Sequence, residues 1–180
     1  MKRMIRSVTA ISAVIGALAT ATAPTVLAGE MAAKFKIGDK APDFTLQEIG
    51  GQRVQLSVAN KGKVVLLAFW SLRCGACLQE IPFVEQLHKS YSGKGVSVLS
   101  VIIDGMDAAS AKAVMKESGV SPSYPVLVDQ DFTASDTYTN FVVPHTLVID
   151  RKGIIRYVHT GFEPGTEKQY EAALVKALGP

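Results

Sequence analysis

The sequence predicts an α/β domain built on a mixed β-sheet, from two buried strands, a helix between them and a late hairpin. Residues 63–69 and 96–103 are apolar runs of the length of strands that are covered on both faces. Between them, residues 74–91 carry apolar side chains at helical spacing. Strand, helix and strand in this order form a parallel pair, whereas a hairpin adds antiparallel strands, so the sheet is mixed.

The predicted sheet begins with a hairpin before the first buried strand. Residues 44–46 and 53–56 are short segments that flank Gly50-Gly51, and glycines between two strands are typical of a tight hairpin turn. We therefore expect an antiparallel pair that lies N-terminal to the strand at 63–69 in the chain.

The second half of the chain supplies two more helices and the late hairpin. Asp107 is a natural N-cap and begins a helix that ends at Gly119. The final helix begins near Thr166, and a helix that follows a complete sheet can cover one of its faces. Its apolar stripe consists of Tyr170, Leu174 and Leu178. Three further strands are expected, at residues 124–128, 146–149 and 154–159.

The first 28 residues have the pattern of a secretory signal peptide. Basic residues at positions 2, 3 and 6 precede an acid-free apolar stretch at 8–23, and Val26-Leu27-Ala28 supplies compact residues before a cleavage point after Ala28. This stretch is shorter than the roughly 20 residues of a typical spanning helix. We expect a periplasmic or otherwise exported protein with a signal peptide at 1–28 and a single domain at 35–180. The alternative is an uncleaved segment that anchors the protein to the membrane.

The charge balance argues against a nucleic-acid partner. The chain has 19 basic and 16 acidic residues, which gives a formal net charge of +3. Cleavage after residue 28 removes three basic residues and no acidic one, so 16 of each are left. The excess positive charge therefore belongs to the targeting segment, and we expect no nucleic acid among the partners.

Both cysteines of the chain, Cys74 and Cys77, lie two residues apart where the first buried strand meets the helix. A helix N-terminus offers unpaired N–H groups and partial positive charge, which stabilise a thiolate, so Cys74 is expected to be the nucleophile. Cys77, one turn later and more shielded, is expected to resolve the mixed disulfide. A disulfide that closes so short a loop stabilises a fold little, which favours a redox role.

Four separated motifs carry a family resemblance. They are Gly38-x-x-Ala41-Pro42-Asp43-Phe44-x-Leu46, Cys74-Gly75-Ala76-Cys77-x-x-Glu80-x-Pro82, Val143-Pro144, and Asp150-Arg151-x-Gly153. With these motifs in order, residues 35–178 resemble the secreted TlpA/ResA-like thiol-disulfide oxidoreductases. The resemblance implies a thioredoxin fold, which is a central mixed β-sheet flanked by helices, with an added N-terminal β-hairpin.

The resemblance also implies roles for three residues near the dithiol. Pro144 would be a cis-proline packed against the two sulfurs, and Val143 before it would offer main-chain hydrogen bonds to an extended substrate. Glu80, one helical turn after Cys77, would perturb the thiols or relay a proton as a catalytic group.

Two further residues are expected to contact the substrate. Trp70 would supply an apolar wall and a hydrogen-bond donor at the mouth of the dithiol. Arg73 stands where the family usually has Trp or another uncharged residue, and it would lower the pKa of the Cys74 thiol or bind an acidic partner. Ala76 replaces a frequent Pro between the cysteines, so the family's reduction potential does not transfer to this chain by analogy.

Two alternative functions are open on the sequence alone. His145, where the family commonly has Thr, would join Cys74 and Cys77 as the third ligand of a Cu(I) or Zn site in a copper-binding or copper-delivery protein. Ser71-x-x-Cys74 resembles the hydroxyl-x-x-Cys motif of peroxiredoxins and favours a thiol peroxidase, although Leu67 occupies the place of their proline.

The favoured function is that of an exported thiol-disulfide oxidoreductase that reduces protein disulfides, for example those of apocytochromes before haem attachment. Its redox-active group would be the Cys74–Cys77 disulfide itself, with no further cofactor. Because an exported compartment is oxidising, a membrane thiol-disulfide electron donor is the expected partner. The direction of electron flow stays open, since Arg73 and a buried Glu80 shift thiol pKa values in opposite directions.

Overall fold

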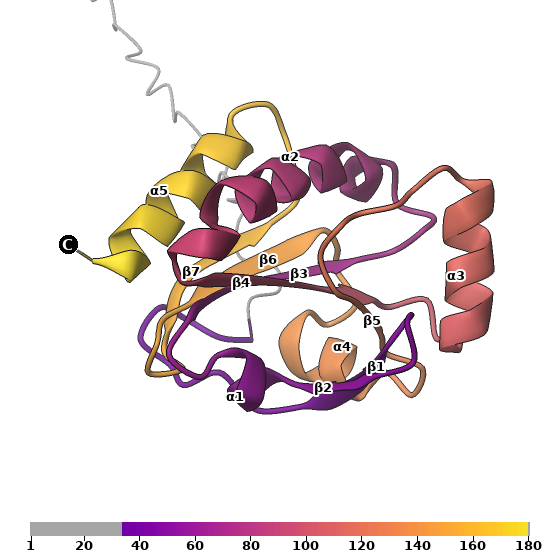
Figure 1. Cartoon of the computed structure of the whole chain (residues 1–180), viewed down its shortest axis with the longest axis horizontal. Coiled ribbons are helices and arrows are strands. Elements are labelled where there is room, and N and C mark those ends of the chain that lie inside the picture. The colour runs from indigo at the N-terminus through magenta and orange to yellow at the C-terminus, as the bar shows by residue number, and fades with distance from the viewer. Residues whose placement is uncertain (1–33, 180) are drawn as a thin grey trace, which may run out of the picture.

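The computed structural model describes residues 34–179, so the predicted signal peptide at 1–28 lies outside the described residues. The described part is a seven-stranded mixed sheet with helices on both faces (Figure 1). The strand order is β2-β1-β5-β4-β3-β6-β7. None of the helices in residues 34–179 has the length and apolar character needed to cross a membrane.

The centre of the sheet is the parallel pair that the sequence predicts. β3 (Val64–Trp70) pairs with β4 (Val96–Ile102) along its whole length, and every residue of β3 is buried. β5 (Val126–Val128) runs parallel to β4 on its other side, and β6 (His145–Ile149) runs antiparallel to β3. A central strand is covered on both faces, which explains the unbroken apolar run in β3.

The two edges of the sheet are the predicted hairpins. β1 (Thr45–Glu48) and β2 (Arg53–Gln55) pair antiparallel, and β1 joins the sheet beside β5. Gly51 in their turn has a φ of 98°, which glycine adopts without a steric penalty. β7 (Ile155–Thr160) pairs antiparallel with β6 at the other edge. The added N-terminal hairpin is therefore confirmed.

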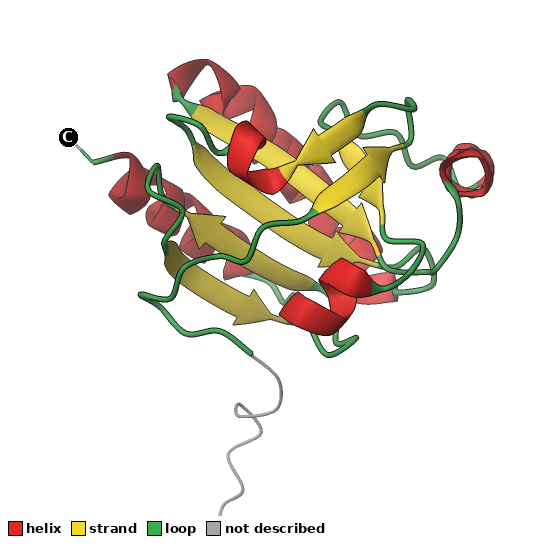
Figure 2. Ribbon diagram, turned by 90° about the horizontal axis from the view of Figure 1, so that it is seen from below, coloured by secondary structure: helices red, strands yellow, loops and turns green. Residues whose placement is uncertain are grey.

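Helices cover both faces of the sheet, with the two long helices on one face and two short helices on the other. α2 (Gly75–Tyr91) and α5 (Thr166–Leu178) contact each other on one face, and α2 runs on into the short 3-10 helix Ser92–Lys94. α1 (Leu56–Ala59) and α4 (Thr133–Tyr138) lie on the opposite face, as Figures 1 and 2 show.

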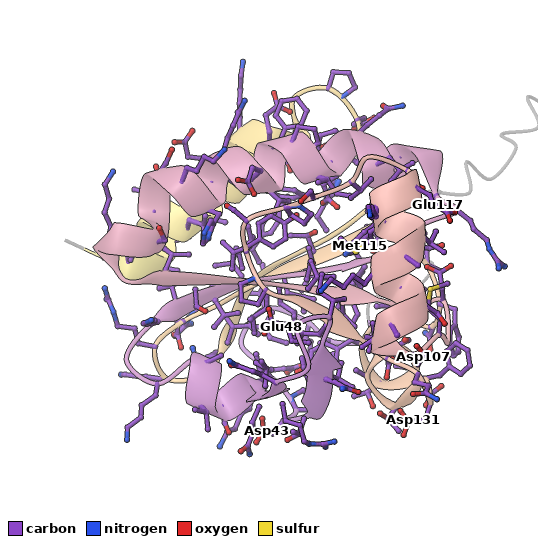
Figure 3. All side chains as sticks on the ribbon, turned by 45° about the vertical axis from the view of Figure 1, so that its right-hand side comes forward. Asp43, Glu48, Asp107, Met115, Glu117 and Asp131 are labelled. Carbon is purple, nitrogen blue, oxygen red and sulfur yellow. A yellow bond between two sulfur atoms is a disulfide. The ribbon has the colours of Figure 1, made fainter. Side chains whose placement is uncertain are left out.

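α3 (Ala108–Glu117) confirms the helix predicted after Asp107. The Asp107 side chain accepts a hydrogen bond from the Ser110 N–H at 2.8 Å, which satisfies one free donor of the first turn. Met115 packs into the core on the side of α3 that is turned to the sheet (Figure 3). α3 therefore joins the same buried cluster as α2 and α5.

The α-helices α1 and α4 were not predicted, and the strands expected at 53–56 and 124–128 are shorter than predicted. The segment 53–56 ends as a strand at Gln55, because Leu56 begins α1. The strand expected at 124–128 begins only at Val126, after Pro125, which has no N–H for a ladder hydrogen bond. α4 has too few apolar residues at helical spacing to be visible in the sequence.

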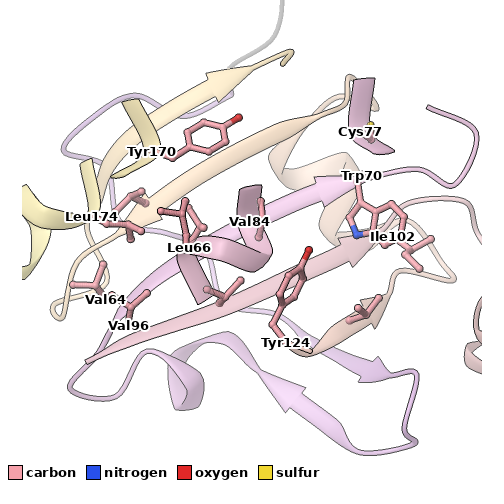
Figure 4. Close-up of a cluster of buried hydrophobic side chains, with 14 of the residues drawn as sticks. Val64, Leu66, Trp70, Cys77, Val84, Val96, Ile102, Tyr124, Tyr170 and Leu174 are labelled. Carbon is pink, nitrogen blue, oxygen red and sulfur yellow. The ribbon is translucent and has the colours of Figure 1, made fainter. Parts of the chain in front are cut away.

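Strand alternation divides the core into two clusters. On β3, Val64, Leu66 and Trp70 face α2 and α5, whereas the intervening residues Val65, Leu67 and Phe69 face α1 and α4. Figure 4 shows the first of these clusters, in which Trp70 lies beneath Cys77 of α2. The dithiol thus sits on top of one cluster, at the carboxyl end of the central strand.

Candidate active site

The disulfide lies where the central strand meets the long helix. Cys74 is the N-cap of α2 and is bonded to Cys77 in its first turn, with the two Cα atoms 5.2 Å apart. The Cys77 N–H donates to Cys74 Sγ at 3.1 Å, so the helix N-terminus faces this sulfur as predicted. Cys77 is fully buried and Cys74 is half-buried, which makes Cys74 the sulfur that a partner can reach.

Cys74 borders a shallow groove of about 510 Å³ at the end of the sheet. The peptide bond between Val143 and Pro144 is cis, as predicted, and the Val143 carbonyl oxygen lies 3.8 Å from Cys74 Sγ. Arg73 is exposed and lines the same groove. The structure therefore brings Arg73 and the cis peptide bond between Val143 and Pro144 to the dithiol, and the contact of these residues with a substrate stays a prediction.

Glu80 lies on the buried face of α2, one turn after Cys77, and only 2% of it is exposed. Its Oε1 accepts hydrogen bonds from Thr146 Oγ1 at 2.8 Å and from the Tyr170 hydroxyl at 2.6 Å. Burial raises the pKa of the carboxyl, and the two hydrogen bonds offset part of that rise. Glu80 is thus a buried acid beneath the dithiol and not an ordinary surface residue.

Sequence reasoning missed the two partners of Glu80. Thr146 lies on β6, where the side chains of Thr146 and Val148 point to the face that carries α2. Tyr170 belongs to the predicted apolar stripe of the last helix, and it is fully buried. A buried tyrosine hydroxyl needs a hydrogen-bond partner, and this requirement was the available signal.

The prediction that Trp70 lines the mouth of the dithiol is wrong for this disulfide form. Trp70 is 1% exposed and belongs to the core cluster beneath Cys77 (Figure 4). It is the last residue of β3, and alternation turns its side chain to the face that α2 covers. Its indole N–H is buried and finds no hydrogen-bond partner among the described residues.

His145 does not complete a metal site. It pairs with Phe69 in the sheet, and its ring lies on the face opposite α2, where Nδ1 is 2.8 Å from Thr160 Oγ1. Within residues 34–179, no group of three His, Cys, Asp or Glu side chains is placed to hold a metal ion. Burial, together with neighbouring His159, lowers the pKa of His145 to about 4. The predicted three-ligand site with the cysteines is therefore wrong in this form.

The loop before Cys74 is fixed by Asp104, which sequence reasoning also missed. Asp104 follows β4, and its carboxylate accepts hydrogen bonds from the Leu72 N–H and from Ser71 Oγ, both at 2.8 Å. Ser71 Oγ in turn accepts from the Arg73 N–H at 3.1 Å. Because the Ser71 hydroxyl donates to Asp104, its hydrogen bond supports the loop and not a peroxide at Cys74.

A larger groove of about 670 Å³ lies at the other end of the sheet, where β3 begins. Its walls come from residues 40–43, 56–57, 60–62, 149 and 151–153, and they contain no cysteine. Thiol-disulfide chemistry is thus possible at the smaller groove beside Cys74 and not at the larger one.

A disulfide at a helix N-terminus, next to a cis-proline on a thioredoxin fold, defines a thioredoxin-fold thiol-disulfide oxidoreductase. Comparison with known protein families agrees with this class. The redoxin family matches residues 36–174, and the chain belongs to that family, among its TlpA/ResA-like members.

The chain is similar to several individual proteins that are named as thioredoxin-like or thiol-disulfide proteins. The chain is 34% identical over 137 residues to the thioredoxin-like protein YneN of Bacillus subtilis, which covers 76% of this chain and 78% of the relative. It is 34% identical over 124 residues to the thiol-disulfide oxidoreductase ResA of the same species, which covers 69% and 67%. A crystal structure from Chlorobium tepidum, assigned as the thiol:disulfide interchange protein DsbE, superposes with a TM-score of 0.72 and 33% identity over 81% of this chain and 99% of that one.

Proposed function

We propose that this oxidoreductase is an exported reductase of protein disulfides, with Cys74 as the attacking sulfur and Cys77 as the resolving one. The observation that carries the proposal is the unequal exposure of the two sulfurs. Cys74 is half-buried at the edge of the groove, whereas Cys77 is fully buried behind it. A partner disulfide reaches the first sulfur and is excluded from the second.

The reaction follows from this arrangement. The Cys74 thiolate bonds to one sulfur of the partner's disulfide, whose S–S bond breaks and releases the other sulfur as a thiolate. Cys77 then attacks Cys74 Sγ, which breaks the mixed disulfide and releases the second partner sulfur. Two electrons pass from the dithiol to the partner as the cysteine pair becomes a disulfide. The cysteine pair supplies both electrons, so the step needs no bound cofactor.

Glu80 supports the second step as a proton acceptor. Cys77 has to lose its proton before it attacks, and Glu80 lies one helical turn away on the same buried face of α2. Its raised pKa brings the carboxyl closer to the range in which it exchanges protons at neutral pH. Thr146 and Tyr170 hold one carboxylate oxygen and orient the group.

The proposed partners are disulfides of exported proteins, with apocytochromes before haem attachment as an example that the family resemblance favours. An exported compartment oxidises thiols, so the reductase needs a source of electrons other than its surroundings. A membrane thiol-disulfide donor fits this need. Charge supports a protein partner over nucleic acid, since the chain without residues 1–28 has equal numbers of basic and acidic residues.

The test is the reduction potential of the Cys74–Cys77 pair, measured by titration against glutathione with Trp70 fluorescence as the signal. Trp70 is the one tryptophan of the chain and packs in the cluster beneath Cys77, so its emission should respond to the disulfide. We expect a value at or below about −250 mV, near that of thioredoxin. A value of about −120 to −180 mV would mark an oxidase or isomerase and overturn the proposal. Cys77→Ala, which has no disulfide to titrate, is the control.

A further inference from the structure

Three exposed apolar residues gather beside the dithiol groove. Phe132 lies in the loop after β5, and Phe141 and Val142 directly precede the cis-proline segment; they are 40%, 50% and 39% exposed. The rings of Phe132 and Phe141 meet edge to face with centroids 5.7 Å apart. Phe141 and Val142 also line the groove that contains Cys74. We call these three residues the aromatic shelf.

The shelf has a fixed position because Phe132 sits directly on Gly105. A Cβ atom at Gly105 would lie 2.2 Å from Cζ of Phe132, far inside van der Waals contact. Gly105 follows Asp104, whose carboxylate accepts from the Leu72 N–H in the loop before Cys74. The shelf and the loop that carries the nucleophile are therefore held by two consecutive residues after β4.

The backbone gives a second reason to look for a function here. Phe132 and Phe141 have φ values of 61° and 63°, in the left-handed region that bulky side chains disfavour. Asn adopts this region more readily, as Asn140 does at 48°. Two exposed aromatic residues thus adopt a backbone conformation that is unfavourable for them. Such strained residues are typical of functional sites.

Thiol-disulfide exchange brings a second protein onto this surface. When Cys74 Sγ bonds to one sulfur of the partner and the partner's S–S bond breaks, the chain on either side of that cysteine has to lie along the groove. Side chains of an extended segment project alternately to its two sides. A segment that paired with the main chain of Val143 and directed its cysteine to Cys74 would bring a neighbouring side chain over Phe141 and Val142, which line the same groove.

We propose that the aromatic shelf selects protein substrates with a large apolar side chain adjacent to the reactive cysteine. This inference rests on the proposed exchange at Cys74 and adds the feature of the substrate that is recognised. Apolar contact area and edge-to-face packing both favour such a side chain over a small polar one. We expect a preference of about tenfold, which corresponds to about 1.4 kcal/mol.

The test uses two short peptides that contain one cysteine each and differ only in whether Phe or Ser follows it. Each cysteine is activated as a mixed disulfide with thionitrobenzoate, which is coloured when it is released. The full chain carries Cys77→Ala, so that Cys74 is its single thiol and the mixed disulfide with the peptide accumulates. The expected rate with the Phe peptide is about tenfold that with the Ser peptide.

The double variant Phe132→Asn with Phe141→Asn removes both rings and suits the left-handed backbone. In the Cys77→Ala background we expect it to reduce the ratio of rates to about one, with a thermal midpoint that is unchanged or higher. Val175→Asn, at an exposed apolar position on α5, is the matched control and should keep the preference. Glutathione activated in the same way has no apolar neighbour, so its rate with each variant measures the intrinsic reactivity of Cys74, and the two peptide rates are divided by it.

A ratio near one with the intact shelf, or a preference that survives in the double variant, overturns the proposal. If the double variant melts below its parent, Phe141→Leu carries the test, because it keeps an apolar side chain and should give an intermediate ratio. Trapping involves Cys74 alone and does not depend on the direction of electron flow. A reduction potential that overturns the proposed reductase function therefore leaves this test intact.

Discussion

The carboxyl of Glu80 is buried in the fold, in an environment that differs strongly from water. It is covered by α2 on one side and by β6 and α5 on the other, where Thr146 and Tyr170 donate to it. Both donors are neutral, so neither supplies the positive charge that would stabilise the ionised form fully. Burial therefore dominates, and the pKa of Glu80 lies above its usual range.

This environment predicts how stability depends on pH. An acid whose pKa is raised by folding stabilises the fold below its unfolded pKa, and this contribution is lost as the pH rises through the folded pKa. Glu80→Gln does not titrate and keeps an oxygen acceptor for Thr146 and Tyr170. We expect the stability of the variant relative to the wild type to increase from about pH 4 to about pH 8, measured by urea unfolding of the oxidised protein.

The matched control is Glu117→Gln, at an exposed position at the end of α3. Its difference from the wild type should show no comparable rise with pH. A constant difference between Glu80→Gln and the wild type over the same range would mean that Glu80 is not destabilised as an anion in the fold.

At the residue scale, sequence reasoning located the cysteines, Pro144 and Glu80 but assigned the side chains around them less well. The reason is the two-residue period of a strand, in which one position decides the face. His145 and Thr146 are neighbours in β6, yet Thr146 reaches Glu80 and His145 lies on the opposite face. Without the sheet register, nearness in sequence to Pro144 made His145 look like the residue beside the sulfurs.

At the scale of elements, the site depends on how the ends of β3 and β4 are joined. The two strands are parallel and end side by side at Trp70 and Ile102. The residues that follow them therefore meet at one edge of the sheet, where Asp104 binds the loop that leads to Cys74. The loop that leads to the nucleophile is thus held by its hydrogen bonds to Asp104, in the segment after β4, and the nucleophile itself lies at the start of α2.

Removal of the Asp104 carboxylate should loosen this connection. Asp104→Ala leaves the Leu72 N–H and the Ser71 hydroxyl without their acceptor, and we expect a loss of about 1–3 kcal/mol in the free energy of unfolding. We also expect slower reaction of Cys74 with activated glutathione, because the loop before it is less well ordered. Asp104→Asn keeps one oxygen acceptor and should lie between the wild type and Asp104→Ala in both measurements.

Glu117→Ala, which removes an exposed carboxylate at the end of α3, serves as the control for the Asp104 variants. It should change neither the unfolding free energy nor the rate by a comparable amount. Equal rates for Asp104→Ala and the wild type, together with a loss of stability, would limit Asp104 to a structural role.

Elements with strong periodicity were predictable, and those stabilised by distant contacts were not. β3, β4, α2 and α5 lie within a few residues of the predicted ranges, because each has an apolar pattern of its own. α4 has none, and it is stabilised by the Asp129 carboxylate, which accepts from the Ala134 and Ser135 N–H groups, and by Tyr138, which stacks on Phe69. These partners become visible only once the strands are placed.

At the scale of the whole molecule, most of the apolar core and the groove beside Cys74 lie in different parts of the fold. Two apolar clusters lie on the two faces of the sheet, and the groove with Cys74 lies at the edge where the central strands end. Cys77, the buried member of the disulfide, belongs to the first of these clusters, so the site and the core meet at this sulfur. The fold class could be predicted from the order of strands and helices, since a strand, a helix and a strand permit few topologies.

The predicted export concerns the whole chain and can be tested directly. Basic residues before an acid-free apolar stretch, with Ala28 before the cut, predict that expression of the full-length chain in a bacterium gives an exported protein that begins at Gly29. Intact mass and N-terminal sequencing of the periplasmic fraction measure this. Ala28→Phe places a bulky residue before the cut and should retain the precursor, whereas Ala32→Phe, beyond the cut, should be processed normally. A full-length wild-type chain in the membrane fraction would instead show that the segment is an anchor, and would place the dithiol at the membrane surface beside its proposed electron donor.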